Sequence, residues 1–108
     1  MGKWLLMVET DSADAAREAE FNEWYNDIHI PDVLETPGFV KATRFERVEP
    51  LEGKAKFLAT YEIEADDINI AMKALRDNMS KKKAEGRYSE LLVLVSTSAY
   101  RLTGSQSK

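Results

Sequence analysis

His29 is the single histidine of the chain, and histidine is the side chain whose ordinary pKa lies closest to neutral pH. It follows a run of aromatic residues and stands two residues before Pro31, where a helix is expected to bend. A neutral imidazole at this position can remove or relay a proton on an activated carbonyl, phenol or lactone. The structural alternative is that the ring hydrogen-bonds carbonyl groups exposed at a helix end.

The residues near His29 offer it two carboxylates and one hydroxyl. Asp27 lies two positions before it and Asp32 three positions after it, so either carboxylate, or neither, orients the ring. The apolar residues before it fall on one helical face, namely Phe21, Trp24, Tyr25 and Ile28. Such a face more often packs on a sheet than lines a pocket, although the Tyr25 hydroxyl needs a partner if it is buried.

Further polar candidates lie on predicted strands: Arg44, Tyr61, Tyr100 and Arg101. Arg44 interrupts a face that is otherwise suited to burial, where a guanidinium can hold a carboxylate or an enolate. An ion pair with Glu46, Glu62 or a partner subunit is the favoured alternative.

Composition excludes several classes of function. The 108 residues include no cysteine, which removes thiol nucleophiles, disulfides and thiolate metal sites, and one histidine cannot form a multi-histidine metal cage. A net charge of −4 argues against binding to nucleic acid or an anionic membrane. Phosphate-binding glycine motifs and a nucleophile elbow are absent, and the lysine triplet at 81–83 is most simply a solvated helix end. We therefore expect no metal, no redox cofactor and no nucleic acid.

The N-terminal apolar run, residues 4–8, is too short for a signal-peptide core or a membrane span. We therefore expect a cytoplasmic protein that does not enter a membrane. Residues 1–103 are expected to form a single domain, and the polar stretch 104–108 a flexible tail.

Periodicity along the chain predicts six elements. Strands are expected at residues 4–9, 39–48, 57–63 and 91–102, the second and third forming a hairpin. A first helix is expected to begin near residue 13, to break or kink near His29 and to end at Thr36-Pro37-Gly38. A second helix carries the apolar stripe Ile68, Met72, Leu75 and Met79.

The resulting order, βαββαβ, predicts an α+β ferredoxin-like fold in which both helices cover one face of a four-stranded antiparallel sheet. Residues 91–95 are apolar on both sides, whereas a strand with one solvated face should alternate. We therefore expect a homodimer that packs sheet face on sheet face.

The segment Phe21–Phe39 resembles the EthD-like family of dimeric α+β barrel proteins. The matching pattern is an aromatic pair before a histidine, a small apolar residue and proline, Pro-Gly-Phe, and then a strand with an arginine at position 44. The resemblance implies a pocket between sheet and helices near His29. It also implies a dimeric barrel, and a superfamily with diverse reactions.

The function predicted from these residues is cofactor-independent proton transfer by His29 on a small apolar or aromatic metabolite. Isomerisation, cyclisation, dehydration and decarboxylation in a catabolic or polyketide-like pathway all fit. The expected substrate-binding residues are Trp24, Tyr25, Ile28, Arg44 and Tyr61. His29 itself is expected at the rim of the pocket. The rival is a non-catalytic binding or accessory protein of a degradation pathway, and a third interpretation makes His29 an axial haem ligand.

Overall fold

A computed structural model describes residues 2–108 and contains the predicted sheet and helices. The strands are β1 (Gly2–Ser12), β2 (Phe39–Glu46), β3 (Phe57–Ala65) and β4 (Leu92–Arg101). The helical segments are η1 (Ala15–Arg17), α1 (Glu18–Trp24), η2 (Tyr25–His29), α2 (Ile30–Val33) and α3 (Ile68–Ala84). Residues 102–108 carry no regular secondary structure.

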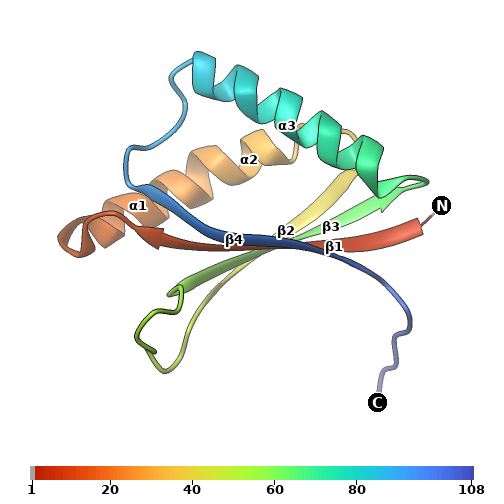
Figure 1. Ribbon diagram of the computed structural model, residues 1–108, viewed down its shortest axis with the longest axis horizontal. Helices are drawn as coiled ribbons and strands as arrows, with labels where there is room; N and C mark the ends of the chain where they lie inside the picture. The colour runs from red at the N-terminus through yellow and green to blue at the C-terminus, as the bar shows by residue number, and fades with distance from the viewer. Residues whose placement is uncertain (1) are drawn as a thin grey trace.

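The four strands form one antiparallel sheet in the order β2-β3-β1-β4. Figure 1 shows α1, α2 and α3 on one side of this sheet, while the chain after β4 curves away on the other side. The predicted ferredoxin-like fold class is therefore confirmed. No helix formed by residues 2–108 covers the other face of the sheet.

The core lies between the helices and the two central strands. Leu6 on β1 is opposite Tyr61 on β3, and both side chains are buried under Phe21 and Tyr25 of the first helix. Burying large apolar side chains of this kind stabilises the fold by about 1.5–3 kcal/mol each. The core thus forms mainly under the first helix, and β4 at the sheet edge stays largely exposed.

The first helix does not break at His29: the break or kink expected there is a local change of helix type, after which the helix resumes as α2. The chain instead continues through a π-helical turn, η2, in which the Ile30 amide donates to the Tyr25 carbonyl five residues earlier. Pro31 then occupies the first turn of α2, where its missing N–H is tolerated. The wider turn accommodates proline without ending the helix, and it places His29 close to Tyr25.

The second helix begins as its sequence predicts. The Asp67 carboxylate caps α3 by accepting from the Asn69 amide at 2.8 Å. At its other end the Lys82 ammonium, which is buried, donates to Glu35 at 2.9 Å and ties α3 to the segment after α2. Its apolar stripe faces the sheet and is only partly buried, which leaves space between α3 and strands β1 and β4.

A shift of register between Phe39 and Lys41 changes which residues of β2 share a face. Phe39 lies opposite Ile63 on the helix side of the sheet. Ala42, opposite Tyr61, and Arg44, opposite Ala59, lie on the same side farther along the strand. Simple alternation along residues 39–48 would place Phe39 on the same face as Thr43 and Phe45, which is wrong because alternation does not anticipate a bulge.

Candidate functional site

A cavity of about 670 Å³ opens between α3, the first helix and strands β1 and β4. Its polar lining includes Tyr25, His29, Tyr61 and Tyr88. Its apolar lining comprises residues of the sheet, the helices and the start of β4, namely Leu6, Val8, Val33, Met72, Leu75, Met79, Leu92 and Leu94. A space of this size, mostly apolar with a few convergent polar groups, is typical of a small-molecule site.

His29 lies in the wall of this cavity and is 8% exposed, rather than at the rim as its helical angle predicts. Its ring stacks on the Trp24 ring with 4.9 Å between ring centroids. It makes edge-to-face contacts with Tyr25 and Tyr88, whose ring centroids lie 4.8 Å and 5.6 Å away. The π-helical turn explains the difference, since it changes the angle at which the last residue of the helix faces the sheet.

Burial lowers the pKa of His29 to about 4. Loss of hydration disfavours the charged imidazolium, and the positive charge of Arg44 acts in the same direction, while the Asp32 carboxylate opposes both. The ring is consequently neutral at pH 7, with a lone pair able to accept a proton or a hydrogen bond.

Tyr25 and Tyr61 bring two hydroxyl groups together in the same cavity. Both side chains are almost fully buried, and their oxygens lie 3.4 Å apart. Burial raises the pKa of both phenols, so both are protonated at neutral pH. The pair carries two hydrogens and uses one in its mutual hydrogen bond, which leaves the second available to a ligand oxygen.

Arg44 lies behind Tyr25 and is not part of the cavity lining. Its guanidinium sits 4.2 Å from the centre of the Tyr25 ring, and its Nη1 donates to Asn26 Oδ1 at 3.1 Å. The expected ion pair with Glu46 or Glu62 is therefore replaced by a cation–π contact. Through this contact the charge of Arg44 lowers the pKa of Tyr25 against the larger effect of burial.

Neither of the two carboxylates considered as partners of His29 hydrogen-bonds to its ring within residues 2–108. Asp27 is exposed, and Asp32 is buried in a bidentate ion pair with Arg87, whose Nε and Nη2 donate at 2.7 Å and 3.0 Å. The Arg87 carbonyl accepts from Trp24 Nε1 at 2.9 Å. These bonds fix the loop after α3 against the first helix, and that loop carries Tyr88 onto the His29 ring.

Of the residues predicted as a site, the structure brings His29, Tyr25 and Tyr61 together in the cavity lining. Trp24 supports the back of the His29 ring and Ile28 is half-buried, but neither lines the cavity. Arg101 lies over the Trp4 ring, and Tyr100 points to the open sheet face.

Sequence reasoning missed several polar residues of the lining, among them Tyr88 and Thr10. Tyr88 lies two residues after Gly86, in a segment between the second helix and the last strand where nothing local indicates a contact with a residue far away in the chain. Thr10 is 1% exposed, and its Oγ1 has no hydrogen-bond partner among residues 2–108. A threonine at the end of an apolar strand does not indicate from sequence alone that its hydroxyl is buried in a cavity wall.

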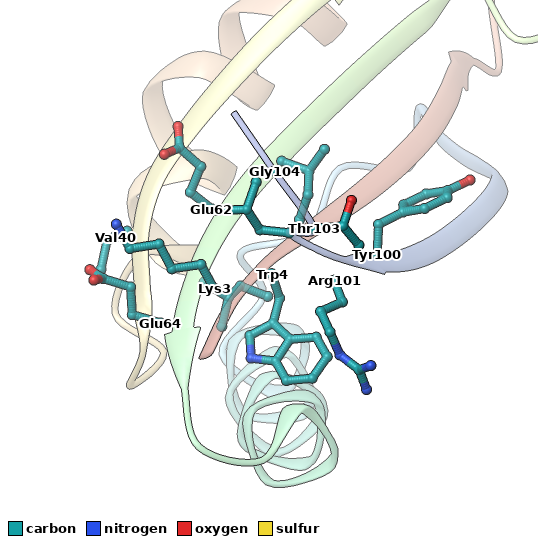
Figure 2. A pocket seen from close by; sticks show the side chains of 12 residues that line it. Lys3, Trp4, Val40, Glu62, Glu64, Tyr100, Arg101, Thr103 and Gly104 are labelled. Atoms are coloured by element: carbon teal, nitrogen blue, oxygen red, sulfur yellow. The ribbon is translucent and has the colours of Figure 1, made fainter. Parts of the chain in front are cut away.

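A second cavity, of about 480 Å³, lies beside the open sheet face and under the chain that follows β4. Figure 2 shows the charged side chains of Lys3, Glu62 and Glu64 on one side of it, and Trp4 and Arg101 on the other. It is built around exposed strand residues and contains none of the three predicted site residues that the first cavity unites.

Within residues 2–108, no group of three or more histidine, cysteine or acidic side chains could hold a metal ion. Over the same range, none of the helices is long and apolar enough to cross a membrane.

The fold and the first cavity define a ferredoxin-like α+β protein with a site of small-molecule size. Comparison with family models is more specific: the chain belongs to the family described as "Domain of unknown function (DUF4286)", whose model matches residues 5–98. No curated protein matches the chain.

Solved structures of several other proteins share the fold. HapK from Hahella chejuensis is 13% identical with a TM-score of 0.73, the match covering 97% of each chain. An EthD family protein from Bacillus halodurans is 17% identical with a TM-score of 0.56, covering 91% of this chain and 97% of that one. The heme-degrader MhuD from Mycobacterium tuberculosis, solved with two hemes in its active site, is 14% identical with a TM-score of 0.65, covering 96% and 99%. The EthD-like resemblance is thus confirmed in fold.

Proposed function

We propose that this protein is a small-molecule enzyme that works without a cofactor, by proton transfer at His29 on an apolar or aromatic carbonyl, phenol or lactone. One observation carries the proposal. The single imidazole of the chain is buried and neutral in the wall of a cavity of about 670 Å³ whose other walls are mostly apolar. A titratable group in such a setting is the general pattern of an acid–base site.

The proposed chemistry divides between His29 and the tyrosine pair. His29 takes a proton from the bound molecule, and the negative charge that develops on the substrate oxygen accepts the spare hydrogen of the Tyr25–Tyr61 pair. Arg44, 4.2 Å behind the Tyr25 ring, favours negative charge at this end of the cavity. Isomerisation, cyclisation, dehydration and decarboxylation in a catabolic or polyketide-like pathway can each use this proton transfer.

The low pKa of His29 sets a requirement on the substrate. A base with a pKa of about 4 removes protons less readily than one with a pKa near 7. A developing enolate or phenolate beside the ring favours the imidazolium and raises the pKa of His29 in the complex. The proposal therefore requires a substrate that becomes anionic during the reaction.

A second candidate is a non-catalytic protein that holds the same molecule for a pathway enzyme. The observation that favours it is the lack of an orienting carboxylate at His29, since Asp32 is held by Arg87. A catalytic histidine is commonly oriented by such a partner. In this candidate His29 exchanges only a hydrogen bond with the ligand.

Exchange of a carbon-bound proton with solvent separates the two candidates. The probe is 2-tetralone in D2O, a bicyclic aromatic ketone with acidic α-protons, followed by NMR. An enzyme gives saturable deuterium incorporation that falls by about 10²- to 10⁴-fold in His29→Gln. Saturable binding with no exchange above the variant contradicts the enzymatic proposal and favours the binding protein. Native mass spectrometry of protein purified without added ligand then identifies the natural molecule.

We also propose that two copies pack through their open sheet faces. Phe45 and Tyr100 on this face are 51% and 53% exposed, and Val93 is 40% exposed opposite Asp11. Large exposed apolar side chains gathered on one face are typical of an interaction surface. The second cavity borders the same face, so this contact would cover it.

Light scattering after size exclusion tests the dimer. Val93→Glu should shift the protein toward monomer, because an unpaired charge buried between sheets costs several kcal/mol. Val48→Glu is the matched control, since Val48 is 94% exposed and lies outside the strands. A monomeric wild type at micromolar concentration refutes the proposal.

The haem interpretation fits the lining poorly. A haem carries two propionates, whereas the lining of this cavity, as far as residues 2–108 form it, offers one cation, Lys83, and one carboxylate, Glu90. We expect no Soret shift that depends on His29 when haem is added to the protein. A shift that is lost in His29→Gln would revive the haem interpretation.

A further inference from the structure

We propose that the molecule bound beside His29 carries an anionic group, and that Lys83 binds this group at the cavity. The inference rests on the proposed function, because it specifies the ligand of the same cavity. The proposed ligand is a small apolar or aromatic acid with one negative charge.

The lysine triplet at the end of α3 is not a uniform solvated end. Lys82 turns toward the first helix and pairs with Glu35, whereas Lys83 joins the lining of the cavity. Lys81 does not line it. Three consecutive residues on a helix point in three directions, so only one of them can serve the cavity.

Lys83 continues the apolar stripe of α3 into the cavity. Met72, Leu75 and Met79 precede it at helical spacing, and all four side chains line the same space. A ligand lying along this stripe has its apolar body against the two methionines and the leucine. Lys83 lies one turn farther along α3 and is exposed, so its side chain can extend toward a charged end of such a ligand.

The charge of Lys83 has no compensating partner within residues 2–108. The nearest acid of the lining, Glu90, is engaged by Arg17 Nη1 at 2.9 Å. The other lining residues with hydroxyl or imidazole groups are neutral at pH 7. An anion brought into this cavity therefore meets the cation Lys83, for which residues 2–108 supply no ion-pair partner, while the carboxylate of the lining, Glu90, is paired with Arg17.

The test uses two fluorescent dyes that share the same aromatic ring system and differ in charge. 1-Anilinonaphthalene-8-sulfonate is anionic, and N-phenyl-1-naphthylamine is the same ring system without the sulfonate. Both are titrated by fluorescence against the full-length protein, Lys83→Gln and the control Lys81→Gln, which changes the same charge two residues away.

We expect Lys83→Gln to lower the affinity for the anionic dye about fivefold and the affinity for the neutral dye less than about twofold. Lys81→Gln should leave both affinities within about twofold of wild type. The affinity of the anionic dye for wild type should also fall with added salt more steeply than its affinity for Lys83→Gln. Equal effects of the two lysine variants, or equal losses for the two dyes, would overturn the inference.

A cavity-filling variant separates this failure from failure of the proposed function. Leu75→Trp places a bulky ring in the cavity and should strongly lower the affinity for both dyes. Met79→Trp serves the same purpose if the first variant does not fold. If the tryptophan variant lowers the affinity for both dyes and Lys83→Gln does not change it, the proposal that Lys83 binds an anionic group is contradicted, while the cavity remains the binding site. Dyes that ignore the tryptophan variant bind elsewhere, which contradicts both the inference and the cavity as the binding site.

Discussion

Replacing His29 should remove a specific pH dependence from the stability of the fold. The unfolded chain binds a proton at this residue near pH 6.5, while the folded protein does so only near pH 4. The folded pKa is depressed, so the unfolded state alone gains the proton between these values and wild type loses stability as pH falls from about 6.5 to about 4. Above pH 6.5 His29 contributes no such penalty.

The magnitude follows from the size of the pKa change. One pKa unit corresponds to about 1.4 kcal/mol, so a fall from 6.5 to about 4 removes about 3 kcal/mol of unfolding free energy by the lower end of that window. His29→Gln has no imidazole to titrate, so its unfolding free energy should lack this loss between pH 6.5 and pH 4. It will be less stable at pH 7.5, because Gln loses the ring contacts with Trp24, Tyr25 and Tyr88.

The assay is urea unfolding of wild type and His29→Gln at pH 7.5, 6.5, 5.5 and 4.5, at one protein concentration because a dimer makes stability concentration-dependent. The carboxylates titrate in both proteins, so the difference between the curves isolates His29. His29→Phe, which keeps an aromatic ring, is the second variant. Parallel stability curves for wild type and both variants, or an imidazole NMR titration centred near pH 6.5, would refute the reasoning.

Three other substitutions test the support around the cavity. Asp32→Asn should lower the unfolding free energy by about 1–3 kcal/mol in urea, because it breaks the bidentate pair with Arg87, whereas the exposed Asp27→Asn should change it by less than about 0.5 kcal/mol. Tyr61→Phe removes one hydroxyl of the buried pair and should slow exchange of 2-tetralone by about tenfold or more; an unchanged rate excludes the pair from the reaction. Phe21→Ala should cost about 3–5 kcal/mol of unfolding free energy without altering the slope between pH 6.5 and 4.

Local patterns in the sequence predict the strands and α3, because alternation and helical spacing are properties of neighbouring residues. The aromatic segment before Pro31 likewise predicts that His29 and Tyr25 belong together. Its π-helical turn is not predictable from propensity, since the turn depends on how the whole helix packs over the sheet around Pro31.

The rest of the site depends on contacts between distant parts of the chain. Arg87 meets Asp32 across 55 positions, and this bond determines where Tyr88 lies. Arg44 finds Asn26 and the Tyr25 ring instead of an acid, because β2 brings it beneath the first helix. A single sequence carries no signal for such pairings, whereas the fold class needs only the order and type of the elements.

The most direct test of a ligand site at His29 uses the imidazole signals of the tag-free protein, which belong to one residue because the chain has one histidine. N-phenyl-1-naphthylamine is titrated into labelled protein and followed by two-dimensional NMR. The account predicts that the His29 ring shifts saturably and shows contacts to the dye, and that Leu75→Trp abolishes both effects. A dye that perturbs Phe45 and Tyr100 on the open sheet face, while the His29 signals stay unchanged, would contradict it.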